Sequence, residues 1–311
     1  MRNFISEDDI EQAILQKLKG DPFQYGILRC DPSPDKRELL PDGTGRSSKK
    51  ECVLPLILRE ALARLNPDIP GEKLEEIARD LCRDFSATDM TATNYKYYNQ
   101  IRNGIKISLR RNGKEDFDFV KLVDFDRPEN NTFTAVSQMW IQGRVYWRRP
   151  DVLIFINGLP MVFVELKNSI VKVEEAYNDN LKNYLRDIPN LFAFNQICVL
   201  SNGLETRLGA FNATYNHFFE WLKVDSEKER PDRQALKEAG TVGESSVRYF
   251  IDGLLQKGRL IDYIENFIMF RNQKNKIIAK NHQYFGVNNL MESVKNRAEL
   301  QGKLGVFWHT Q

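Results

Sequence analysis

Residues 150–167 read PDVLIFINGLPMVFVELK, and this stretch is the strongest indication of the fold. Two apolar runs flank the dipeptide Asn157-Gly158, which is a strong signal for a hairpin turn. Folding of the hairpin brings Asp151, at the start of the first strand, beside Glu165 and Lys167, at the end of the second. Glu165 and Lys167 are two residues apart, so they point to the same face of their strand. The stretch therefore predicts an antiparallel strand pair with three charges at one end.

The register of this hairpin decides whether the two carboxylates can share a face. Directly opposed residues of an antiparallel pair lie on the same face. If Asp151 opposes Glu165 or Lys167, the loop must contain an odd number of residues. A two-residue Asn-Gly turn would put Asp151 on the opposite face unless a bulge intervenes. We therefore expect an odd loop or a β-bulge.

The three charges lie at the edge of an otherwise apolar hairpin, where an unpaired ion would cost several kcal/mol. A hard divalent cation between two carboxylates would offset that cost, and Mg²⁺ is commonly held by one or two carboxylates. Such a cation polarises a phosphoryl oxygen and acidifies bound water. Lys167 could orient that water or stabilise charge on the phosphate. The alternative is a surface ion pair between Glu165 and Lys167, with Asp151 as a strand-initiating cap.

Residue periodicity outside the hairpin predicts an α/β protein. Residues 6–19 form an amphipathic helix with Ser6 as N-cap. Short β-branched and aromatic runs between residues 105 and 170, and again at 196–203, predict the strands of a sheet. Further helices are expected at 53–65, 71–84, 172–186, 216–225, 246–270 and 286–298, a loop at 31–50, and a strand in the terminal run 304–311. The expected fold class is a mixed sheet flanked by helices.

Bulk composition excludes several classes of protein. Lys and Arg number 45 against 43 Asp and Glu, a formal charge of +2, so any contact with nucleic acid must come from local patches. The four cysteines and three histidines are scattered without a CxxC pair, which argues against a zinc site or a disulfide framework. The N-terminus is acidic where a signal peptide would be basic, and no apolar stretch approaches membrane-spanning length. We expect a cytoplasmic protein with no membrane partner.

The pattern P-D-x(13)-E-x-K at residues 150–167 resembles the PD-(D/E)xK nuclease motif. The surrounding residues resemble the N-terminal nuclease region of type I restriction enzyme motor (R) subunits. Residues 129–138 (ENNTFTAVSQ), 184–203 (YLRDIPNLFAFNQICVLSNG), 280–287 (KNHQYFGV) and the terminal GVFWHTQ resemble that family in the same order. The resemblance covers nearly the whole chain and is weakest in residues 20–100. It implies a restriction-endonuclease-like fold and Mg²⁺-dependent hydrolysis of DNA phosphodiesters.

The resemblance also implies roles for individual residues. Asp151 and Glu165 become metal ligands, and Lys167 becomes the catalytic lysine. An early helix often supplies another acid, for which Glu11 is the best match, although it could equally be a solvated helix residue. The family's Q-x-x-x-Y motif corresponds to Asn180 and Tyr184, four residues apart on one helix face. Asn replaces Gln there, which puts the role of Asn180 in doubt, and Tyr184 could instead be an aromatic at the edge of the core.

The C-terminal part resembles the entry into an ATP-driven motor. Residues 226–234 are charged and contain Pro231, so we expect an endonuclease domain over residues 1–230, then a linker and the truncated start of a helicase-like domain over 231–311. By resemblance, Gln283 is the counterpart of a glutamine that recognises adenine. The chain contains no GK[ST] sequence, so the phosphate-binding loop is missing. We expect ATP to be a cofactor of the full-length subunit only.

Basic residues near Asp151 are candidates for contact with the DNA backbone. Arg144, Arg148 and Arg149 precede it directly, and phosphate contacts of this kind position a duplex without reading sequence. The alternative is that they are solvated strand ends. By resemblance, target recognition belongs to a specificity subunit in complex with methylation subunits. The sequence thus predicts an endonuclease acting on double-stranded DNA; the alternative is a catalytically silent docking or DNA-binding module of a larger translocase.

Overall fold

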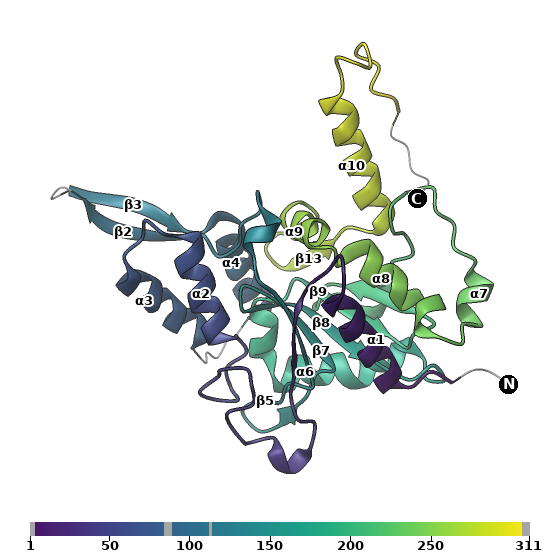
Figure 1. Ribbon diagram of the computed structural model, residues 1–311, viewed down its shortest axis with the longest axis horizontal. Coiled ribbons are helices and arrows are strands. Elements are labelled where there is room, and N and C mark those ends of the chain that lie inside the picture. The colour runs from purple at the N-terminus through teal and green to yellow at the C-terminus, as the bar shows by residue number, and fades with distance from the viewer. Residues whose placement is uncertain (1–3, 84–88, 112–113, 307–311) are drawn as a thin grey trace.

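The computed structural model describes residues 4–83, 89–111 and 114–306, and a mixed sheet lies at its centre (Figure 1). Within these residues the sheet has seven strands, in the order β1 (Gly26–Arg29), β4 (Phe133–Ser137), β7 (Val152–Ile156), β8 (Leu159–Leu166), β9 (Ile197–Ser201), β10 (Thr206–Gly209) and β11 (Phe219–Glu220). The pairs β1–β4 and β8–β9 are parallel, and the other neighbours are antiparallel. The hairpin predicted from residues 150–167 therefore forms the middle of the sheet.

Helices cover both faces of this sheet. The α-helices are α1 (Glu7–Lys19), α2 (Pro55–Leu65), α3 (Gly71–Cys82), α4 (Met90–Asn103), α5 (Val173–Glu175), α6 (Lys182–Asp187), α7 (Arg233–Lys237), α8 (Ser246–Leu254), α9 (Lys257–Asn266) and α10 (Asn281–Lys295). Ser6 caps α1 in a capping box with Asp9, as the sequence predicts. The predicted fold class, a mixed α/β sheet flanked by helices, is confirmed. Each described helix is too short or too polar to cross a lipid bilayer.

Two apolar clusters show why the middle strands are apolar at every position. Val152 and Ile154 of β7 belong to a cluster that includes residues of α1, α8 and α9. Leu153 and Phe155 belong to a second cluster on the other face, together with Leu181 and residues around α6. A strand buried on both faces has no polar alternation, which accounts for the continuous apolar runs.

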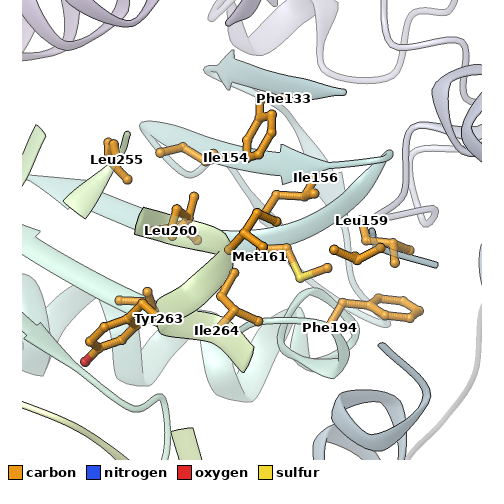
Figure 2. Close-up of a cluster of buried hydrophobic side chains, with 14 of the residues drawn as sticks. Phe133, Ile154, Ile156, Leu159, Met161, Phe194, Leu255, Leu260, Tyr263 and Ile264 are labelled. Carbon is orange, nitrogen blue, oxygen red and sulfur yellow. The ribbon is translucent and has the colours of Figure 1, made fainter. Parts of the chain in front are cut away.

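The first cluster also extends beyond the domain boundary expected near residue 230. Leu260, Tyr263 and Ile264 of α9 lie in one buried group with Ile154 of β7 and Met161 of β8 (Figure 2). Residues from α8 belong to the same cluster. The core is thus continuous across residue 230, whereas α10 extends away from the body (Figure 1).

Several expected elements differ in the structure. Residues 216–225 were expected to be helical, but they form the end of a 3₁₀ turn, the short strand β11 and an extended segment. Phe218 packs into one apolar cluster and Trp221 into the other, so this segment runs along the sheet edge with aromatic residues on both sides. Three-residue spacing of aromatics mimics a helix here, but burial on two opposite faces requires extended chain.

The expected single sheet over residues 105–170 is also corrected. Strands β2 (Ile105–Arg111) and β3 (Lys114–Val120) form a separate hairpin that projects from the body (Figure 1). Asp116 and Asp118 oppose Leu109 and Ile107, so the hairpin carries carboxylates on the face where a central strand would need apolar residues. Two further short pairs, β5 (Ile141–Gln142) with β6 (Trp147–Arg148) and β12 (Ile268–Arg271) with β13 (Asn275–Ile278), lie outside the seven-stranded sheet.

The remaining differences concern element boundaries. The helix expected at 246–270 is two helices followed by β12, and α10 begins at Asn281 rather than 286. Helix α4 was not predicted. The expected C-terminal strand lies largely outside the described residues, and residues 304–306 have no regular secondary structure.

Candidate active site

The register of the β7–β8 hairpin places Asp151 opposite Glu165. The turn is the two-residue Asn157-Gly158, with φ angles of 51° and 82°, as a type I′ turn requires. A bulge at Met161 then shifts the pairing, because Ile154 pairs with Val162 while Phe155 pairs with Pro160. The register beyond the bulge pairs Val152 with Val164, and one step further it aligns Asp151 with Glu165. The prediction of an odd loop or a bulge is confirmed, and the bulge is the solution that this chain uses.

The hairpin turn is fixed by the surrounding protein. The Asn157 carboxamide donates to the Leu122 carbonyl oxygen at 2.9 Å and accepts the Thr132 N–H at 2.8 Å. A Cβ at Gly158 would lie 2.6 Å from the Leu54 carbonyl oxygen, in a left-handed conformation that favours glycine. The turn is therefore packed too tightly against α2 for the register to slip easily.

Asp151, Glu165 and Lys167 come together at one end of the hairpin, where Glu165 is buried and the other two are half-buried. The Asp151 Oδ2 accepts the Leu166 N–H at 2.7 Å, which ties the start of β7 to the end of β8. The Lys167 Nζ lies 3.7 Å from Glu165 Oε1, and the Glu165 side chain is only 2% exposed. Glu165 Oε2 is buried and has no hydrogen-bond partner. One ammonium group thus faces two carboxylates, which leaves the group short of positive charge.

Asn180 and Tyr184 approach the same carboxylate from the helical layer. The Asn180 carboxamide donates to Glu165 Oε1, and the Tyr184 hydroxyl lies 3.4 Å from that oxygen and 3.2 Å from the Arg149 carbonyl oxygen. Asn180 lies in η3 (Ala176–Leu181), a stretch of π-helix between α5 and α6. Such stretches are rare and occur frequently at functional sites. The helix predicted at 172–186 is therefore interrupted where Asn180 reaches Glu165.

Burial raises the pKa of both carboxyl groups, and the charge of Asp151 adds to the rise at Glu165. Burial raises the pKa of Asp151 to about 6, partly opposed by the Leu166 N–H and by Lys167. Burial, followed by the charge of Asp151, raises the pKa of Glu165 well above its usual range. Two acids that resist ionisation beside a single lysine form a site that added positive charge would stabilise.

A cleft of about 410 Å³ opens beside Asp151 and reaches α1. Its lining comprises Glu7, Asp8, Glu11, Gln12, Arg29, Cys30, Pro32, Ser137, Gln138, Arg149 and Asp151. Glu11 is buried and accepts a hydrogen bond from the Gln138 carboxamide. Burial raises the pKa of Glu11, and the hydrogen bond to Gln138 opposes the rise. Glu11 is thus a buried side chain of this cleft, not a solvated helix residue.

The acids do not form a three-ligand cage. Among the described residues, no group of three or more His, Cys, Asp or Glu side chains is arranged to hold a metal ion. Asp151 and Glu165 align across the hairpin, whereas the carboxylate of Glu11 is engaged by Gln138. The role of Glu11 as a third ligand stays a prediction.

Comparison with known proteins places this geometry in a family. The family model described as "Type I restriction enzyme R protein N terminus" matches residues 4–217, which include the hairpin, α1 and the π-helical stretch. This chain belongs to that R-protein N-terminal family. The predicted restriction-endonuclease-like fold is consistent with the mixed sheet and its flanking helices.

Relatives of this R-protein N-terminal chain come from bacteria and archaea. The type I restriction enzyme HindI endonuclease subunit of Haemophilus influenzae is 32% identical over 99% of this chain and 28% of its own length. A Methanocaldococcus jannaschii protein, provisionally named the type I restriction enzyme MjaIXP endonuclease subunit, is 29% identical over 97% of this chain and 29% of its own length. The chain therefore spans less than a third of these relatives.

The three arginines of this R-protein region differ in their surroundings. Arg148 Nε donates to Asp187 Oδ2 at 2.8 Å, so its guanidinium already has a buried partner. Arg149 lines the cleft, donates to the Pro32 carbonyl oxygen and lies over the Trp140 ring at 5.2 Å. Arg144 is exposed between β5 and β6. Only Arg149 of the three is among the residues that line the cleft.

Two further residues complete the comparison with the sequence. Gln283 is exposed in the first turn of α10, outside the cleft lining, and its Oε1 accepts the Lys280 N–H at 2.8 Å. Its role in binding adenine stays a prediction.

Gln138 was not singled out from the sequence, although it ends the segment ENNTFTAVSQ that resembles the family. A lone glutamine after a strand gives no signal, because its importance comes from contacts with Glu11 and Asp151.

Proposed function

We propose that this chain carries the DNA-cleaving site of a type I restriction enzyme R subunit and hydrolyses phosphodiester bonds with the help of Mg²⁺. The observation that carries this proposal is the Asp151–Glu165 pair beside Lys167, in which the buried Glu165 Oε2 is left without a partner. A buried carboxylate oxygen without a donor costs free energy and calls for a ligand. Family membership supports the same reading.

The residues present fit a hard divalent cation. Asp151 and Glu165 supply the hard oxygen ligands that Mg²⁺ prefers, and the raised pKa of both acids is what a bound cation would reverse. Asp151 and Glu165 would hold the ion, with Glu11 as a candidate third ligand. When bound, Mg²⁺ supplies Lewis-acid polarisation of the phosphoryl oxygen and makes water more acidic.

The chain's own groups would orient and neutralise the substrate. The Lys167 ammonium can hold the attacking water or stabilise the negative charge that grows on the phosphate. Asn180 and Tyr184 hold Glu165 Oε1, so that Oε2 keeps a fixed direction. Second contacts of this kind orient a ligand and tune its basicity. Both residues would therefore act through Glu165 rather than on the substrate.

Arg149 at the cleft and the exposed Arg144 between β5 and β6 would contact DNA phosphates, whereas Arg148 would do so only by leaving Asp187. In the whole subunit, Gln283 would recognise adenine of ATP. Double-stranded DNA and the methylation and specificity subunits of a restriction complex would be the partners. The names of the relatives, which are endonuclease subunits of type I restriction enzymes, support this assignment.

A nicking assay on supercoiled plasmid tests the proposal. The chain is incubated with Mg²⁺, alone and within a reconstituted restriction complex, beside Asp151→Ala. Asp252→Asn is a matched control, because Asp252 forms a surface ion pair with Lys17 of α1 outside the cleft. We expect Mg²⁺-dependent nicking that Asp151→Ala abolishes and Asp252→Asn preserves. Nicking that survives Asp151→Ala would refute the assignment, and absence of nicking in both settings would favour the silent docking module.

A further inference from the structure

Gln138 has an unusual backbone conformation at the edge of the acidic cleft. It directly follows β4, and its φ of 56° lies in the left-handed region, which a residue with a Cβ adopts only at a cost. Its backbone N–H donates to the Asp151 carbonyl oxygen at 3.0 Å. The strained residue is thus joined directly to Asp151, the residue that precedes β7.

The Gln138 side chain has one end bonded and one end free. Its Nε2 donates to Glu11 Oε2, which fixes the orientation of the carboxamide. Its Oε1 is buried and has no hydrogen-bond partner. A buried acceptor without a donor costs free energy, because it has given up its hydrogen bonds to water. Left-handed backbone at a non-glycine residue adds a similar cost, and such costs persist together where function requires them.

We propose that Gln138 is a positioning residue, which holds Glu11 toward the Asp151–Glu165 pair through its Nε2 and keeps its buried amide oxygen as an acceptor for a donor that enters with the ligand. The inference rests on the proposed function. Glu11, Gln138 and Asp151 all line the same cleft. Glutamine suits the task because it donates to one carboxylate and offers an acceptor without adding charge. A glutamate would repel Glu11, and a lysine would neutralise the site.

Two substitutions separate the amide from the backbone strain. Gln138→Gly removes the side chain and relieves the left-handed strain, whereas Gln138→Met keeps the length and the strain but removes both hydrogen-bonding groups. Gln24→Gly is the matched control, because Gln24 also has a left-handed φ, 49°, but is exposed and outside the cleft. Each variant of the full chain is followed by the Mg²⁺ concentration that gives half of the rise in unfolding temperature, and by its nicking rate.

We expect both Gln138 variants to need at least tenfold more Mg²⁺ than the parent, and to nick at least tenfold more slowly, within the roughly 10–100-fold range seen when an outer hydrogen-bond partner is lost. Without Mg²⁺, Gln138→Gly should unfold at a higher temperature than Gln138→Met. Gln24→Gly should keep the parent's Mg²⁺ midpoint and rate.

Unchanged midpoints in both Gln138 variants would overturn the inference, as would a change in Gln138→Gly alone, since backbone geometry would then explain it. A parent that binds Mg²⁺ but does not nick would refute the proposed function, while the midpoints would still decide the role of Gln138. A parent whose unfolding temperature does not respond to Mg²⁺ would overturn the inference itself.

Discussion

Two of the places where the chain buries charged side chains, Lys276 and the Asp151–Glu165 pair, differ in how the charge is satisfied. Lys276 of β13 is 3% exposed, and its ammonium donates to the Asn195 carbonyl oxygen at 2.5 Å, Gln196 Oε1 at 2.9 Å and Asn94 Oδ1 at 3.1 Å. All three donors of the ammonium are thus used. At the Asp151–Glu165 pair, by contrast, one carboxylate oxygen has no donor and a cleft opens beside Asp151.

This difference separates a buried charge whose hydrogen bonds are complete from one that is open to a ligand. The Asn94 carboxamide, which accepts from Lys276, also donates to the carbonyl oxygens of Phe192, Ala193 and Asn195. Lys276 therefore completes a sealed network that joins the β12–β13 hairpin to α4 and to the segment before β9. A network that is complete stabilises the fold, whereas one that is incomplete at an open cleft can accept a ligand. Removal of Lys276 should therefore lower stability and leave cleavage unchanged. Removal of the Glu165 charge should reduce cleavage and, without divalent ions, raise stability.

The largest expected effect is the loss of cleavage in the Glu165→Gln variant. The substitution keeps an acceptor for Asn180 but removes a ligand and a negative charge, so nicking should fall by more than the roughly 100-fold that loss of an outer partner costs. Without divalent ions the variant should be more stable than the parent, because repulsion from Asp151 disappears. Plasmid nicking and urea unfolding in EDTA measure the two effects. If the variant lost both cleavage and stability, Glu165 would be a structural buried charge like Lys276.

Lys276→Ala should show the reverse pattern. It leaves two buried acceptors, Asn94 Oδ1 and Gln196 Oε1, without the ammonium donor, and each can cost about 1–3 kcal/mol, so the free energy of unfolding should fall by several kcal/mol. Below the unfolding temperature, nicking should remain near the parent's rate. Lys274→Ala, at an exposed residue two positions earlier, is the matched control. Stable protein with reduced nicking would show that Lys276 serves the reaction.

The pH dependence of stability offers a further contrast. The pKa of Asp151 is raised to about 6 in the folded chain from 3.8, so its contribution to stability is present below pH 3.8 and is lost as the pH rises through 6. In EDTA, the parent should therefore lose stability relative to Asp151→Asn across this window, by about 1.4 kcal/mol for each unit of pKa difference. Urea unfolding at several pH values checks this. Parallel stability curves for the two proteins would contradict the raised pKa.

The sequence predicted the hairpin and its charges because that information is local. A turn dipeptide, two apolar runs and residue parity are enough to require a bulge or an odd loop, and the bulge at Met161 meets that requirement. The first helix was predicted equally well from Ser6 and its acidic first turn. Contacts that join distant segments were not predictable in this way. Neither the bond from Gln138 to Glu11 nor the burial of Lys276 leaves any periodic trace in the sequence.

Segments with aromatic residues on both sides were the main source of error. Phe218 and Trp221 suggested a helix, although they reach opposite faces of the sheet edge.

The β12–β13 hairpin was missed because its exposed positions include apolar residues, Met269 and Ile277, which weaken the alternation expected of a strand. Tertiary packing decided both cases.

The smallest expected effects distinguish Arg148 from Arg149. Arg148 already has a buried partner, Asp187, whereas Arg149 lines the cleft. Arg148→Ala should lower the free energy of unfolding by about 1 kcal/mol, because Arg186 still pairs with Asp187 after the loss. Arg149→Ala should leave stability nearly unchanged but weaken DNA binding. The slope of the logarithm of the binding constant against the logarithm of the salt concentration should become shallower by about the contribution of one phosphate contact. DNA titrations at several salt concentrations measure this slope. An equal reduction of the slope in both variants would mean that Arg148 leaves Asp187 and binds a phosphate when DNA is present. The ion pair between Arg148 and Asp187 would then be a contact of the DNA-free protein only.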